Sequence, residues 1–182
     1  MTGSWLGSNA SVQRGNEGDS AIRLLSEQPQ PSSILITDDA LTHAENAGVW
    51  EAVLQYVRHG GTSVIMGHFS SYVKPPAIKP FFAKAGLQWE VGSYHRTTLV
   101  LNQEVVANAL GLFVKNAASA DAWYLTDKSS VIGSQAFAAT SARIVGETAV
   151  ALARIEREKL GYVGVVTAEK GSDAVILAMC GL

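Results

Sequence analysis

The stretch Ser33–His68, SILITDDALTHAENAGVWEAVLQYVRHGGTSVIMGH, decides the fold of this chain. Its apolar runs Ser33–Thr37 and Thr62–Gly67 are bordered by turn residues, which is typical of strands buried on both faces. Between these runs, apolar side chains recur at helical spacing and predict a helix over Ala44–Arg58 that ends at His59–Gly61. The order strand, helix, strand predicts two adjacent parallel strands joined by a right-handed crossover.

Length and composition limit the class of protein. The chain has 182 residues, of which 47% are hydrophobic and 16% charged, so a single domain over residues 1–182 can bury a core. The net charge of −2 lacks the basic excess typical of nucleic-acid-binding proteins. No apolar run approaches the about 18 residues of a membrane span, residues 1–20 lack the pattern of a signal peptide, and Cys180 is the only cysteine. We therefore expect a cytoplasmic protein with no membrane or nucleic-acid partner. Because the chain has neither G-x-G-x-x-G nor a Lys-Ser/Thr after Gly60-Gly61, no cofactor is expected either.

Other segments predict further helices and strands. Helices are expected over Ala21–Leu25, Pro76–Ala85 and Ser172–Cys180, and strands over Ala10–Arg14, Leu87–Val91, Thr97–Leu101, Asp121–Leu125 and Gly161–Val166. The segment Gln103–Ala118 is ambiguous and is interpreted as a helix followed by a strand at Leu112–Val114. Buried tryptophans are expected at Trp50, Trp89 and Trp123, whereas His43 and His59 are expected to be exposed at helix ends.

Residues 147–160 allow two interpretations. Their content of Ala, Leu, Arg, Glu and Lys favours a helix by propensity. The same residues also fit a strand at Ala149–Ala153, a charged turn and a second strand, because tertiary context overrides propensity.

A family resemblance rests on Thr37–Thr42, Tyr56–Gly61 and Val64–Phe69, which flank and follow the predicted helix. This pattern resembles the class I glutamine amidotransferase-like superfamily, and within it the ThuA-like (trehalose-utilisation-like) branch, in which the strand after Gly-Gly ends in a histidine, here His68. The strand at Gly161–Gly164 and the terminal helix are similar to that branch, so the resemblance runs from Ser33 to the C-terminus. It implies a three-layer, mostly parallel, flavodoxin-like α/β sheet with helices on both faces, and it favours the antiparallel hairpin over residues 147–160.

Two departures from the family pattern change what the resemblance implies. The enzymes of the group place a nucleophilic cysteine in a G-x-C-x-G turn, whereas this chain has Gly67-His68-Phe69-Ser70-Ser71 there, so cysteine-dependent glutaminase chemistry is not expected. The family's central first strand is also missing before Val12, and residues 1–20 are expected to be irregular or rebuilt. An exposed strand edge would then be covered either by Ser4–Arg14 folding back or by a second copy of the chain. The Gly- and Ser-rich N-terminal segment favours a homodimer.

Polar side chains that follow strands are the candidate site residues, because ligands bind at the carboxyl ends of parallel strands. His68 follows the strand Thr62–Gly67 and is a candidate general acid or base, or else a histidine that closes a turn. Asp38 and Asp39 follow the first strand. One of them could cap the next helix or turn, and the functional alternatives are that they orient His68, ligate a metal or contact a ligand. Ser70 lies beside His68, but the G-x-S-x-G pattern of a serine nucleophile is absent.

A second polar cluster, Ser93–Thr98, precedes the strand expected at Thr97–Leu101. Its members Tyr94, His95 and Arg96 are candidate ligand contacts, since a guanidinium binds carboxylate or phosphate with a planar fork. The alternative is an ordinary polar turn. No histidine or carboxylate spacing matches a metal motif, so no metal is expected.

Two functions from different classes remain. The first is a small-molecule-binding protein or an enzyme, namely a hydrolase, lyase or isomerase acting on a small sugar-like or carbonyl substrate. His68 would be its general acid or base, and it would share a pocket with His95 or Arg96. The second is a non-catalytic amidotransferase-like domain that acts as a partner-binding or structural module. The α/β fold hosts both classes.

Overall fold

The computed structural model describes residues 10–101, 104–115, 125–126, 131–134, 137–141, 147–156, 158–165 and 170–182. It is a mixed α/β structure. Its helices are α1 (Gly18–Ser26), α2 (Ala47–Arg58), α3 (Phe69–Tyr72), α4 (Pro75–Lys84) and α5 (Lys170–Cys180), with two 3-10 turns, η2 (Ala40–Thr42) and η3 (Ala44–Asn46). Its strands are β1 (Ser33–Ile36), β2 (Thr62–Ile65), β3 (Glu90–Leu101), β4 (Glu104–Lys115), β5 (Leu125–Thr126), β6 (Val131–Ser134), β7 (Phe137–Ser141), β8 (Glu147–Thr148), β9 (Val150–Ile155) and β10 (Glu158–Val163).

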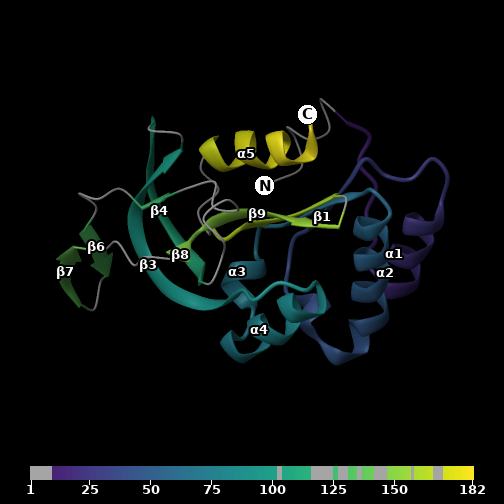
Figure 1. Ribbon diagram of the computed structural model, residues 1–182, viewed down its shortest axis with the longest axis horizontal. Helices are drawn as coiled ribbons and strands as arrows, with labels where there is room; N and C mark the ends of the chain where they lie inside the picture. The colour runs from purple at the N-terminus through teal and green to yellow at the C-terminus, as the bar shows by residue number, and fades with distance from the viewer. Residues whose placement is uncertain are drawn as a thin grey trace.

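The strands form two sheets (Figure 1). Sheet A has the order β1-β2-β10-β9, in which β1, β2 and β10 are parallel and β9 is antiparallel to β10. Sheet B has the order β7-β6-β3-β4-β8, with β5 beside β3, and all its pairings are antiparallel. The strands β8 and β9 are separated by Ala149 alone, so one run of chain links the two sheets.

The predicted strand–helix–strand unit is confirmed. The strands β1 and β2 pair in parallel with Ile36 opposite Ile65, and α2 connects them. Alternate residues of β2 face two different cores: Ile65 packs in the cluster that contains Trp50 of α2, and Val64 packs in the cluster that contains Met179 of α5. This burial on both faces explains why the strand is a continuous apolar run.

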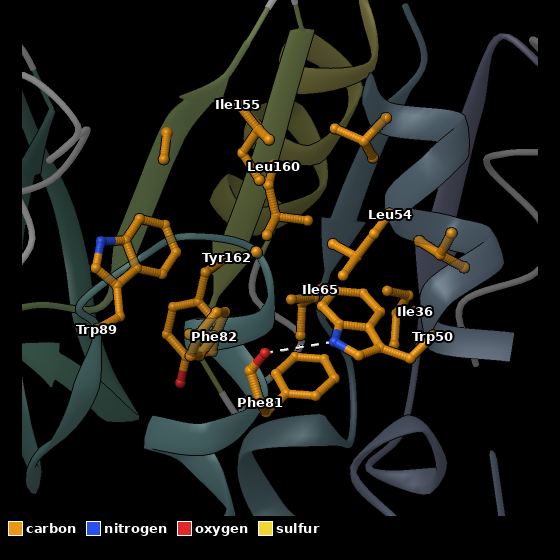
Figure 2. Packing of buried hydrophobic residues seen from close by; sticks show 14 of the residues in the cluster. Ile36, Trp50, Leu54, Ile65, Phe81, Phe82, Trp89, Ile155, Leu160 and Tyr162 are labelled. Atoms are coloured by element: carbon orange, nitrogen blue, oxygen red, sulfur yellow. Dashed lines mark hydrogen bonds between the residues drawn. The ribbon is translucent and has the colours of Figure 1, made fainter. Parts of the chain in front are cut away.

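Aromatic side chains fill the larger core (Figure 2). The ring of Trp50 stacks on Phe81 at a centroid distance of 4.1 Å, and its indole Nε1 donates a hydrogen bond to the Phe81 carbonyl oxygen at 3.3 Å. Phe82 meets Trp89 and Tyr162 edge to face. The predicted burial of Trp50 and Trp89 is confirmed, and Trp123 lies outside the described residues.

The hairpin interpretation of residues 147–160 is confirmed. Strands β9 and β10 pair antiparallel with Glu158 opposite Ile155, and the turn places Glu156 at a φ of 54°. Cross-strand pairing and burial of Ala151, Ala153 and Leu160 outweigh the local helix propensity. Gly161 allows α5 to lie close to β10, because a Cβ atom there would stand 2.9 Å from the Met179 sulfur.

Helix predictions were right in type but not always in bounds. The helices α4 and α5 match the expected Pro76–Ala85 and Ser172–Cys180 closely. Helix α1 starts earlier than the expected Ala21, because Glu17 and Ser20 form a reciprocal capping box at its N-terminus.

Strand predictions outside sheet A need correction. Residues 10–14 form no strand and are mostly exposed. The strands expected at Leu87–Val91 and Thr97–Leu101 are one strand, β3, with a register shift between Val91 and Tyr94. The helix expected within Gln103–Ala118 is wrong, since β4 pairs there with β3 over a long range. The strand expected at Asp121–Leu125 lies mostly outside the described residues.

The prediction of one mostly parallel sheet therefore holds for sheet A, while sheet B is an antiparallel addition that the sequence did not indicate. Within the described part of the chain, none of the helices is both long and apolar enough to cross a membrane.

Candidate functional site

The carboxyl ends of β1 and β2 meet at one edge of sheet A, as the parallel pairing requires. Beyond the paired residues, the backbone N–H of Met66 donates to the Ile36 carbonyl oxygen at 2.8 Å, and that of His68 donates to the Thr37 carbonyl oxygen at 2.8 Å. Gly67 turns the chain there with a φ of +65°, a conformation that favours glycine. A Cβ atom on Gly67 would stand 2.9 Å from the Thr37 oxygen. The structure thus brings His68 next to the segment that carries Asp38 and Asp39.

The two aspartates make contacts within their own turns. The Oδ1 atom of Asp38 accepts a hydrogen bond from the Ala40 backbone N–H at 3.0 Å, which is the i, i+2 bond of an Asx turn. The Oδ2 atom of Asp39 lies 3.3 Å from Nε2 of His43. The Thr42 hydroxyl also donates to the Asp39 carbonyl oxygen at 2.7 Å. The Asp38 side chain therefore makes the turn contact of the simpler interpretation, whereas the Asp39 side chain contacts His43 and makes no capping hydrogen bond to η2.

His68 is exposed and stands at the start of the four-residue helix α3. Its backbone N–H is held by Thr37, and its ring lies 5.7 Å from the ring of Tyr72, which is 65% exposed. Among the described residues, no side chain forms a hydrogen bond or an ion pair with the His68 imidazole. The adjacent Ser70 is buried, and its hydroxyl has no hydrogen-bond partner in the described part of the chain. His68 and Ser70 thus differ in access to solvent.

Tyr94, His95 and Arg96 lie in sheet B. They are inside β3, not in a turn before a strand as expected, and they pair with Leu112, Gly111 and Leu110 of β4. Arg96 also pairs with Gly133 of β6. The Tyr94 side chain is 56% exposed, while the side chains of His95 and Arg96 lie outside the described residues. A pocket shared with His68 stays a prediction.

Two polar contacts could not be expected from the sequence. The backbone N–H of Ser93, in the irregular part of β3, donates to the Glu147 carboxylate at 3.1 Å across 54 residues of chain. His43 lies between Asp39 and Glu45, with Nδ1 3.7 Å from the Glu45 carboxylate. The predicted exposure of His43 and His59 is confirmed. Among the described residues, no three His, Cys, Asp or Glu side chains are grouped in a way that could hold a metal ion.

Cys180 lies on α5, away from the β2–α3 turn where the family pattern places its nucleophile. Burial raises the pKa of its thiol, and a hydrogen bond with the Ser33 side chain partly offsets the rise. A thiol with a raised pKa holds little of the reactive thiolate at neutral pH.

Comparisons with known proteins give only distant likenesses. No family model matches the chain, and no curated protein matches it. Among solved structures, a β-galactosidase from Bacillus circulans sp. alkalophilus matches with a TM-score of 0.44 at 13% identity, over 74% of this chain and 20% of that enzyme. An exo-β-1,4-mannosidase from Opitutaceae bacterium strain TAV5 matches with a TM-score of 0.42 at 11% identity, over 89% of this chain and 29% of the mannosidase. A GH42 β-galactosidase from G. stearothermophilus has a TM-score of 0.35 at 10% identity, over 81% of this chain and 20% of that enzyme. The chain thus spans less than a third of each enzyme's length, and we draw nothing about function from these likenesses.

Proposed function

We propose that this chain is a non-catalytic amidotransferase-like domain that acts as a partner-forming module. The observation that carries this proposal is the use of the carboxyl-edge side chains by the fold itself. The Asp38 carboxylate bonds to the Ala40 N–H, and the Asp39 carboxylate contacts His43. A carboxylate engaged in this way is less available to orient a catalytic imidazole.

The environment of His68 supports the same proposal. A general base is most effective when a further group orients its ring, and the described ring contact of His68 is the exposed Tyr72. The family resemblance, with its flavodoxin-like three-layer arrangement and ThuA-like placement of His68, stays part of the proposal. The parallel β1–α2–β2 unit, the helices packed against sheet A and the β9–β10 hairpin are compatible with it.

The partner in this proposal is a second copy of the chain, paired through β1. Among the described strands, only β2 pairs with β1, so β1 lies at an end of sheet A. Because the Ile36 carbonyl oxygen faces β2, strand geometry directs the N–H and C=O groups of Leu35 away from β2. The described N-terminal residues do not supply the alternative cover, since residues 10–16 form no strand and 11–17 are exposed.

Antiparallel pairing of two β1 strands about a two-fold axis would join two four-stranded sheets into one. Such pairing gives hydrogen-bond partners to the N–H and C=O groups at the strand edge, which would otherwise favour non-specific association. This dimer would be a cytoplasmic assembly without a resident cofactor.

Light scattering on wild type, Leu35→Pro and Leu35→Ala tests this proposal. Wild type and Leu35→Ala should have twice the 19.3 kDa chain mass, since both keep the Leu35 N–H. Leu35→Pro lacks that donor and should be monomeric, and edge strands tolerate proline better than central ones do. A wild-type protein that stays monomeric on concentration would refute the dimer.

A second function is favoured by the exposure of His68 beside Tyr72, which leaves the imidazole open to a small molecule. In this alternative the chain binds or converts a sugar-like or carbonyl compound. His68 acts as the acid or base, and the contacts come from Asp38, Asp39, Ser70, Tyr94, His95 and Arg96. His68→Ala should then abolish binding or turnover while changing the melting temperature little. Retained binding with a large loss of stability would make His68 a structural turn residue.

A further inference from the structure

The segment Asp38–Asn46, which leaves sheet A after β1, contains a histidine at the joint of two turns. His43 ends η2, where its N–H donates to the Ala40 carbonyl oxygen at 3.1 Å. It also begins η3, where its carbonyl oxygen accepts from the Asn46 N–H at 3.1 Å. The geometry of both turns therefore depends on the same residue.

The imidazole of His43 lies between one carboxylate from each side of this joint. Its Nε2 atom is 3.3 Å from Oδ2 of Asp39, the residue before η2. Its Nδ1 atom is 3.7 Å from Oε1 of Glu45 within η3. Each ring nitrogen thus faces a different carboxylate.

Protonation decides whether both contacts are favourable. A neutral imidazole has one N–H donor and one lone pair, so it can donate to one carboxylate while its lone pair faces the other. The imidazolium ion has two N–H donors and carries a positive charge, so it attracts both carboxylates at once. Histidine is the side chain whose charge changes near neutral pH. Both carboxylate contacts of the His43 ring are therefore favourable only when the imidazole is protonated.

The other charged groups near these turns make no ion pair with His43 in the described part of the chain. Helices α2 and α4 pack against η2, and α2 also packs against η3. Their charged side chains are Glu51 and Arg58 on α2 and Lys79 and Lys84 on α4, with Lys74 just before α4. Glu51 pairs with Arg58 and Lys79 pairs with Glu90. In the described part of the chain, the ion pairs of His43 are those with Asp39 and Glu45 alone.

We propose that His43 is a pH-sensitive staple that tightens the Asp38–Asn46 segment when its imidazole is protonated. When the imidazole is protonated the cation lies between Asp39 and Glu45 and attracts both carboxylates, and when it is neutral the Glu45 contact is lost. The Asn46 side chain, which donates to the Ala40 carbonyl oxygen at 2.9 Å, spans the same turns at every pH, so the segment loosens without unfolding. This staple acts on the turns that follow β1, and it does not depend on the proposed pairing of two chains.

Amide hydrogen exchange of the Asn46 N–H, measured by NMR below and above neutral pH and corrected for intrinsic rates, tests the staple. Because the ion pairs are exposed, wild-type protection should rise by about two- to fivefold at the lower pH. His43→Gln should remove this pH dependence, and Glu45→Gln should reduce it. The matched control is His59→Gln: His59 ends α2 with Nδ1 2.7 Å from the Gln55 carbonyl oxygen and should leave the dependence unchanged.

A pH dependence that persists in His43→Gln would overturn the proposal, as would wild-type protection that does not change with pH. Loss of the dependence in His59→Gln would also overturn it, because the effect would then arise elsewhere on the chain. If His43→Gln disturbs the backbone of the turns, the pair Asp39→Asn and Glu45→Gln replaces it. Both variants keep the histidine and must each reduce the dependence.

Discussion

Replacement of Gly67 by alanine tests how the carboxyl edge of sheet A is built. Gly67 has a φ of +65°, and an L-residue in the left-handed region costs about 1–2 kcal/mol. A Cβ atom would also stand 2.9 Å from the Thr37 carbonyl oxygen, a backbone atom that cannot move away cheaply. Relief of that contact would weaken the 2.8 Å bond from the His68 N–H to the same oxygen, at about 0.5–1.5 kcal/mol. The expected total loss is about 2–3 kcal/mol.

Gly86→Ala is the matched control for this prediction. Gly86 has a similar φ of +77°, yet a Cβ atom there would meet nothing within 4 Å. The two variants share the backbone strain and the loss of unfolded-state entropy. Their difference in unfolding free energy therefore measures the crowding at Thr37, expected to be about 1 kcal/mol.

Urea denaturation of wild type and both variants provides the measurement. With a slope of about 2 kcal/mol per molar urea, the midpoint of Gly67→Ala should lie about 0.5 M below that of Gly86→Ala. Equal midpoints, or a lower midpoint for Gly86→Ala, would refute the close β1–β2 approach on which the site description depends.

Three further predictions concern buried and titrating groups. Ser63→Ala should stabilise the protein by up to about 1 kcal/mol in urea denaturation, since the Ser63 hydroxyl is buried without a partner among the described residues; a loss above about 1 kcal/mol would contradict this. Cys180 should react with a thiol reagent more slowly than free cysteine at neutral pH, because burial raises its pKa, and equal rates would be the contrary result. Hydrogen bonds from Gln55 and then from Arg58 lower the pKa of Glu51 from its usual value, so Glu51→Gln should cost stability near neutral pH but not in acid, where the wild-type carboxyl is protonated; an equal loss at both pH values would argue against it.

The elements β1, α2 and β2 could be predicted because their signals are local. The apolar runs around Ile36 and Ile65 are short, bordered by turns and separated by one amphipathic helix, so strand type and direction follow from the pattern. The bond of Asp38 to the Ala40 N–H follows from a two-residue spacing that is common in turns. These features need no knowledge of distant parts of the chain.

Sheet B and the second polar cluster could not be predicted for the opposite reason. The strand β3 pairs with β4 on either side of Gly92 and Ser93, and at the irregularity between them the Ser93 N–H bonds to Glu147, which is 54 residues away. Residues 104–115 contain no strong local strand signal, so the pairing with β3 determines their conformation. The interpretation of Tyr94 and Arg96 as turn residues was wrong for the same reason.

The central proposal, pairing of two chains through β1, is tested most directly by hydrogen exchange of the peptide that covers Ser33–Ile36. Mass spectrometry at high and at submicromolar protein concentration compares associated and dissociated chains. The proposal predicts that the Leu35 amide, which points away from β2, exchanges slowly at high concentration and quickly on dilution. Exchange of this peptide that is fast, or equally slow, at both concentrations would contradict the proposal.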